Sequence, residues 1–197
     1  MCNHKFRIHP LFFVVWIFFL FLDRSSYVLY LFISAMIHES AHIAAYLTYG
    51  AQMEYIRLMP FGISAKLQSL TAISCKKEIY SSLAGICANL ITAGVCAMIY
   101  QKIPLDGLDF FILCNLSLAT INAIPILPLD GGRALYYFLL QKTDPIRAKK
   151  ICLCLAIILL IPLFGLAIFI LIKTGYNFSL LMIDCYLLLY LIVKKTD

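Results

Sequence analysis

Long apolar runs separated by short polar connections dominate the pattern of this chain. A helix needs about 20 mostly apolar residues to cross the hydrocarbon core of a bilayer. Runs of this kind occur at 8–22, 27–49, 79–100, 110–129, 151–172 and 178–193. The first and last runs are short, so five spanning helices are an alternative to six. We therefore expect an all-α polytopic membrane protein of about six transmembrane helices, organised as one domain over residues 1–197.

The longest connection between these runs, residues 50–78, is not uniformly polar. Apolar and polar residues alternate on both sides of Pro60, Phe61 and Gly62, and alternation with a period of two is typical of strands. The pattern predicts a short membrane-surface β-hairpin or re-entrant segment near 52–68. An irregular interfacial loop fits these residues equally well.

The composition supports a lipid environment. Hydrophobic residues make up 63% of the chain and charged residues 13%, with a mean hydropathy of +0.93, whereas a soluble domain is about half apolar and about a quarter charged. The net charge of +6 is spread between apolar runs rather than gathered on one stripe, so we expect no nucleic-acid partner. The eight cysteines contain no Cys-x-x-Cys pair, which favours apolar packing over disulfides or a thiolate metal site.

The basic residues agree with six spans. With the N-terminus inside, the only lysines and arginines on the outer side are Arg24, Lys102 and Lys173. Cytoplasmic connections of membrane proteins carry an excess of these residues. We therefore expect a multi-pass protein with both termini in the cytoplasm.

The second run contains two histidines four positions apart, His38 and His42, with Glu39 beside the first. On a helix these histidines share one face and can bind the same zinc ion, and the carboxylate of Glu39 can then reach a water at the metal. Such residues are costly in the middle of a bilayer unless they are paired or coordinated. A polar cluster satisfied between helices is the alternative to a metal site.

A catalytic zinc site needs a third protein ligand and one open position. Two aspartates in apolar surroundings are candidates, Asp130 and Asp184. Asp184 has no motif around it, whereas Asp130 follows Pro125 and Pro128 and precedes two glycines. Backbone broken in this way is tolerated at membrane depth only where protein or a cavity covers it. An ordinary loop entrance after the fourth run remains the alternative for this stretch.

Together, His-Glu-x-x-His in an early apolar run and Asn-x-x-Pro-x-x-Pro-Leu-Asp-Gly-Gly after a later one resemble the site-2 protease family of intramembrane zinc metalloproteases. Ile8-His9-Pro10 and Leu58-Met59-Pro60-Phe61-Gly62 resemble the stage IV sporulation protein FB branch of that family. The likeness covers about residues 5 to 135. The C-terminal nucleotide-sensing domain that this branch often carries has no counterpart before Asp197, so we expect no ATP regulation through such a domain.

The resemblance implies a role for each matching residue. His38, His42 and Asp130 correspond to the zinc ligands, with one Zn²⁺ per chain, and Glu39 to the general acid/base. Asn89 and Asn122 correspond to residues that hold the substrate backbone or orient the site, although an amide that packs helices together is the alternative for each. The position after Gly85, usually proline in the family, is Ile86 here.

We therefore expect a zinc metalloendopeptidase in a bacterial cell membrane that performs regulated intramembrane proteolysis. The resemblance implies a membrane-tethered protein substrate, such as a sporulation sigma-factor precursor, and small membrane regulatory proteins as partners. A membrane metal-binding or metal-transport protein that uses the same ligands is the main alternative. The sequence assigns no role to Asp184 or His9.

Overall fold

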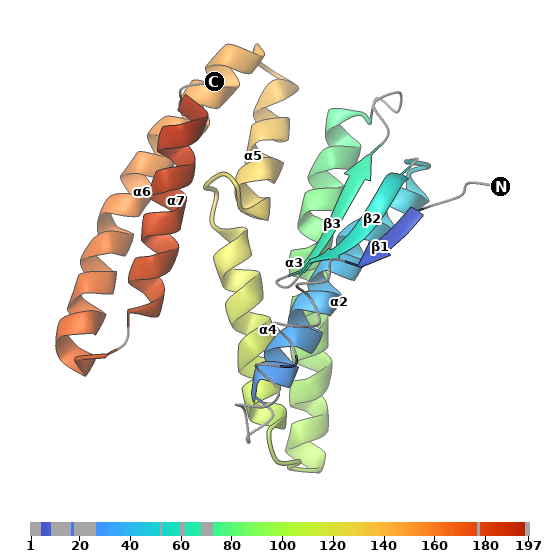
Figure 1. Cartoon of the computed structure of the whole chain (residues 1–197), viewed down its shortest axis with the longest axis vertical. Helices are drawn as coiled ribbons and strands as arrows, with labels where there is room; N and C mark the ends of the chain where they lie inside the picture. The colour runs from blue at the N-terminus through green and yellow to red at the C-terminus, as the bar shows by residue number, and fades with distance from the viewer. Residues whose placement is uncertain are drawn as a thin grey trace. The chain divides into compact units, whose positions relative to one another are not determined.

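The computed structural model describes the chain in two units, Met1–Asn122 and Ala123–Asp197. Figure 1 shows the course of the backbone. The described residues are 5–8, 17, 27–51, 53–59, 62–67, 73–176 and 178–195.

Helices α2 (Tyr27–Thr48), α3 (Cys75–Lys102) and α4 (Leu108–Ala123) form the helical part of the first unit. Buried polar contacts join α2 to its neighbours. The hydroxyl of Tyr46 donates to the Glu78 carboxylate at 2.8 Å, and the amide of Asn115 donates to the Ser34 hydroxyl at 2.9 Å. These contacts join α2 to α4 in its N-terminal half and to α3 near its C-terminal end, because buried polar groups in an apolar helix layer need partners.

Three short strands form a sheet in the same unit: β1 (Lys5–Ile8), β2 (Met53–Met59) and β3 (Gly62–Leu67). The strand order is β1-β2-β3. Strand β1 runs parallel to β2, with Lys5 opposite Tyr55, and β3 pairs antiparallel with β2. The sheet therefore joins the N-terminal segment to the connection that follows α2.

The second unit contains α5 (Asp130–Leu140), α6 (Pro145–Thr174) and α7 (Ser179–Lys195). Its core is formed by Ile126, Ala156, Leu160 and Leu187. Asp144 caps α6, since its side chain accepts a hydrogen bond from the backbone N–H of Arg147, and Gly175 ends the helix with a φ of 75°. Helix α7 then runs back along α6 (Figure 1).

The expected all-α architecture with about six spanning helices is wrong. The chain forms the sheet described above, and within the described residues three helices are long and apolar enough to cross a membrane: α2, α3 and α6. Helix α4 has 16 residues, a length of about 24 Å against a hydrocarbon core of about 30 Å. The predicted run 110–129 stops at Ala123 because Pro125 follows, and the residue before a proline disfavours helical geometry.

The other predicted runs have different outcomes. Runs 27–49, 79–100 and 151–172 correspond to α2, α3 and α6, while 178–193 corresponds to the shorter apolar helix α7. The predicted run 8–22 lies outside the described residues apart from Ile8 and Ile17. Helix α5 was not predicted. Strands β2 and β3 lie in the segment 52–68. For this segment the sequence left open a β-hairpin, a re-entrant segment and an irregular loop.

Candidate metal site

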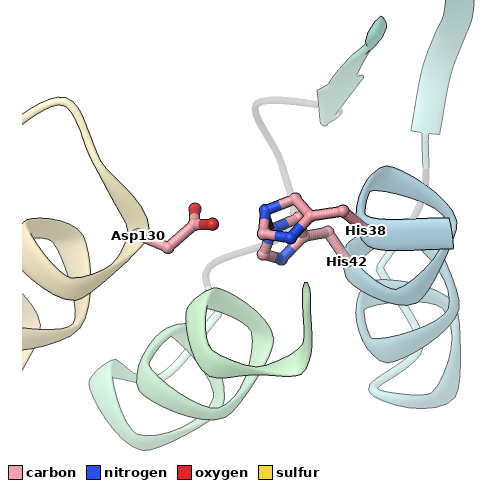
Figure 2. A group of neighbouring side chains, drawn as sticks. All are labelled: His38, His42 and Asp130. Carbon is pink, nitrogen blue, oxygen red and sulfur yellow. Dashed lines mark hydrogen bonds between the residues drawn. The ribbon is translucent and has the colours of Figure 1, made fainter. Parts of the chain in front are cut away.

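Helix α2 brings His38 and His42 together as the spacing of four predicts. Both side chains are buried, and their Nε2 atoms lie 3.1 Å apart (Figure 2). The two rings meet edge to face, with centroids 4.7 Å apart. Two imidazole nitrogens bound to one tetrahedral zinc at about 2.05 Å would be about 3.3 Å apart. The pair is therefore spaced like two ligands of one ion.

A carbonyl group of α3 fixes the orientation of the second imidazole. The Nδ1 atom of His42 lies 2.7 Å from the backbone oxygen of Ser81. A carbonyl oxygen can only accept, so Nδ1 carries the proton and donates it. The Nε2 atom of a neutral His42 is then the acceptor nitrogen: it can accept a hydrogen bond from Nε2 of His38 or bind a metal, the arrangement that carbonyl partners commonly impose on metal-binding histidines.

Gly85 of α3 makes room for these rings. A Cβ atom at this position would lie 2.8 Å from Cε1 and from Nε2 of His38, and closer still to Nε2 of His42. Any side chain at residue 85 would therefore occupy the space beside the two nitrogens. Gly85 lies inside the regular helix α3, so its backbone conformation does not call for glycine. The close approach of the two rings does.

Asn89 lies one helical turn beyond Gly85 on α3. Its side chain is fully buried, and neither amide atom has a hydrogen-bond partner within the described part of the chain. A buried amide without a partner costs about 1–3 kcal/mol, which indicates a polar group that a ligand can satisfy. Asn122 differs, since its amide donates to the carbonyl of Leu118 at 3.0 Å in its own helix.

Glu39 lies between the two histidines in sequence and is half-buried on α2. A neighbouring buried pair, Tyr46 and Glu78, continues the His38–His42 face of α2 by one more turn. Glu78 ends the connection 50–78 that the apolar runs predict, but the residue lies in the first turn of α3 and is buried. The spacing His38, His42, Tyr46 was the available signal for this contact.

In the second unit, Asp130 is the first residue of α5 and is buried. A carboxylate is stabilised at a helix N-terminus by the helix dipole, and the guanidinium of Arg133 lies 3.9 Å from Oδ1. A Cβ at Gly131 or Gly132 would clash with the backbone of Ala123 or Ile126. The two glycines therefore allow α5 to pack closely against the preceding loop.

The chemistry of these donors fits a metal. His38, His42 and Asp130, all drawn in Figure 2, each offer a ligand atom of the type that zinc binds, and all three are buried. Asp184 is buried in α7, and its carboxylate has no hydrogen-bond partner among the described residues. His9 lies outside the described residues.

The sequence is similar to known metalloproteases and to a sporulation protein. Residues 101–163 match the model of peptidase family M50. A zinc metalloprotease of Methanocaldococcus jannaschii is 31% identical over 143 residues, which cover 69% of this chain and 41% of that protein. Stage IV sporulation protein FB of Bacillus subtilis is 25% identical over 159 residues, which cover 77% of this chain and 55% of that protein. The chain thus spans about half the length of these relatives.

A solved structure extends the similarity. The site-2 protease from Methanocaldococcus jannaschii matches with a TM-score of 0.62 and 26% identity, covering 91% of this chain and 85% of that one. The resemblance to site-2 proteases drawn from the sequence is confirmed by these matches. The similarity to metalloproteases points to a bound metal, and the long apolar helices α2, α3 and α6 point to a membrane protein.

Proposed function

We propose, on the premise that this chain is a relative of the site-2 proteases, that it is an intramembrane zinc metalloendopeptidase that cuts a membrane-associated protein. The observation that carries the proposal is the imidazole pair of α2. The Nε2 atoms of His38 and His42 lie 3.1 Å apart, and the contact of His42 with Ser81 makes its Nε2 the acceptor nitrogen, the form in which it can bind a metal. Gly85 keeps the space beside both nitrogens open.

Zinc binding by His38, His42 and Asp130 would leave one position open for chemistry, as in other catalytic zinc sites. A zinc ion held there supplies Lewis-acid activation of the attacking water and of the scissile carbonyl. Glu39 takes the proton from the water and delivers it to the leaving amine. General acid–base catalysis of this kind contributes about 10²–10⁴-fold.

Asn89 is the residue that we assign to substrate binding. Its two unpartnered amide atoms match the donor and acceptor of a peptide group. An unwound substrate segment exposes such groups and must satisfy them in an apolar environment. Asn122 has a more limited role in this proposal: its amide already bonds its own helix, so it supports the end of α4.

The charges of each unit favour one orientation in a bacterial cell membrane. In the first unit, β1 lies beside β2 near the start of α3, and the basic residues Lys5, Arg7, Arg57, Lys66, Lys76 and Lys77 gather on these elements. The other end of α3 precedes Asp106 and Asp109. By the positive-inside rule, the sheet and the N-terminal segment face the cytoplasm in a multi-pass protein.

The same rule applies to the second unit. Arg147, Lys149 and Lys150 occupy the first turns of α6, and α7 returns along α6 to end at Lys195. The C-terminal end would therefore also face the cytoplasm. From the similarity to stage IV sporulation protein FB, we propose a membrane-tethered precursor, such as a sporulation sigma factor, as substrate, with small membrane proteins as regulators.

The test is co-expression of the full chain with tethered precursors, comparing wild type with Glu39→Gln and measuring bound zinc in both. We expect Glu39→Gln to keep its zinc and to lose at least about 100-fold of the cleavage rate. Asp109→Asn, at the other end of the first unit, is the control and keeps full activity. A metal carrier using the same ligands predicts instead that zinc-dependent transport survives Glu39→Gln and that no precursor is cut by wild type.

A further inference from the structure

A pocket of about 770 Å³ lies within the second unit and is lined by α5, α6, α7 and the loop before α5. Its volume is within the range of about 300–1,000 Å³ that is usual for ligand sites. Three basic residues line it: Arg133 of α5 and Lys149 and Lys150 of α6. No acidic residue is among the described residues that form its wall. The charge of the pocket therefore selects an anionic ligand.

The rest of the lining is aromatic and apolar. Tyr136, Tyr137 and Tyr190 contribute rings, and Leu127 and Leu153 contribute aliphatic groups. Tyrosines concentrate where membrane proteins meet the headgroup region, and lysines there extend their ammonium groups toward the lipid headgroups. The composition of the pocket is that of a site at the membrane–water interface.

An apolar groove continues from this pocket along the two last helices. The groove has a volume of about 440 Å³ and shares Leu153 and Leu191 with the pocket. Its further lining comes from the exposed face of α6 and α7, including Ile157, Ile161 and Leu188. A ligand that fills both spaces has an anionic head and a long hydrocarbon chain.

We propose that this pocket and groove together bind one anionic phospholipid. The headgroup phosphate contacts Lys149, Lys150 and Arg133, and an acyl chain lies along the groove between α6 and α7. Basic pockets between membrane helices on the cytoplasmic side bind anionic headgroups in this way. The guanidinium of Arg133 lies 3.9 Å from the Asp130 carboxylate, near the upper limit for an ion pair. A lipid phosphate would give this guanidinium a second anionic partner.

The groove distinguishes a phospholipid from other anions. Inorganic phosphate or glycerol phosphate would use the basic residues alone and would leave the apolar lining of α6 and α7 exposed. An acidic peptide would satisfy the charges, but it brings no hydrocarbon chain to the groove. The proposal depends on the second unit and not on the proposed protease activity, so either can fail without the other.

The experiment is native mass spectrometry of the purified full chain, titrated in detergent with dioleoyl phosphatidylglycerol or dioleoyl phosphatidylcholine. We expect wild type to retain one phosphatidylglycerol molecule and to discriminate against phosphatidylcholine. The double variant Lys149→Gln/Lys150→Gln should bind phosphatidylglycerol about 30-fold more weakly, because each lysine near an anionic lipid contributes about a factor of five. Ile161→Trp should weaken lipid binding by filling the groove.

The matched control is Lys142→Gln/Lys173→Gln, which removes the same charge from lysines that lie over Phe138 and Phe169 rather than in the pocket. This control should bind the lipid as wild type does. If the double variant does not fold, the single variants at the exposed residues 149 and 150 should each show about a fivefold loss. Unchanged binding in these variants, or displacement of the lipid by equimolar glycerol phosphate or an acidic peptide, would overturn the proposal.

Discussion

Replacing Gly85 with alanine tests the packing of α3 against the imidazole pair. The added Cβ would lie 2.8 Å from Nε2 of His38 and closer to Nε2 of His42, whereas comfortable contacts begin at about 3.5 Å. Both rings, or α3 itself, must therefore move by about 0.7 Å or more. A displacement of about 1 Å at a reacting centre can cost about 100-fold in rate, and overpacking costs about 1–3 kcal/mol of stability.

The assay for Gly85→Ala combines zinc content, the rate of precursor cleavage and thermal unfolding of the purified chain. We expect weaker zinc retention and a cleavage rate lower by about 100-fold. Gly94→Ala is the matched control on the same helix, because a Cβ there has no atom within 4 Å. That control should be as stable as wild type or more stable, since alanine favours a helix over glycine by about 1 kcal/mol. Wild-type zinc content and activity in Gly85→Ala would refute the reasoning.

Further predictions concern the metal and three buried residues. Removing the metal with a chelator should abolish precursor cleavage, and adding Zn²⁺ should restore it; cleavage that persists in metal-free protein would count against a zinc enzyme. Asn89→Ala should keep its zinc but lower kcat/KM by about 10–100-fold, because a hydrogen bond worth about 1–3 kcal/mol to the substrate is lost; an unchanged kcat/KM would assign Asn89 to packing. Tyr46→Phe should lower the free energy of unfolding by about 1–3 kcal/mol, since it removes the donor to the buried Glu78 carboxylate, while the exposed Tyr80→Phe should have no effect. Asp184→Leu should raise the unfolding temperature, because the buried carboxylate lacks a partner among the described residues; a lower unfolding temperature would reveal a partner.

The local sequence pattern was sufficient to bring His38 and His42 together, but not to identify the residues that surround them. The spacing of His38 and His42 determines their common face once α2 is helical, so this pair could be predicted from local pattern alone. The carbonyl of Ser81 could not, because any residue supplies a carbonyl and only the packing of α3 selects this one. The same holds for Gly85, whose importance depends on its distance from two rings on another helix.

The fold differs from the prediction where distant segments meet. Strand β1 is only four residues long and pairs with residues about fifty positions later, so no local alternation reveals it. Helix α5 was missed because Gly131 and Gly132 are weak helix formers. Their role is close packing against Ala123 and Ile126, and this contact compensates for their low propensity. The length of α4 was overestimated because hydropathy alone carries the apolar pattern through Pro125.

Zinc affinity in ligand variants tests the central claim most directly. Competition with a chromophoric chelator should give one zinc per chain in wild type. His42→Ala and Asp130→Ala should each weaken zinc binding by about 100-fold or more, a loss larger than that usual for residues that only support a ligand. Asp144→Ala, which removes an exposed helix cap on α6, should bind zinc as wild type does. Wild-type zinc affinity in Asp130→Ala would contradict the assignment of this carboxylate as the third ligand.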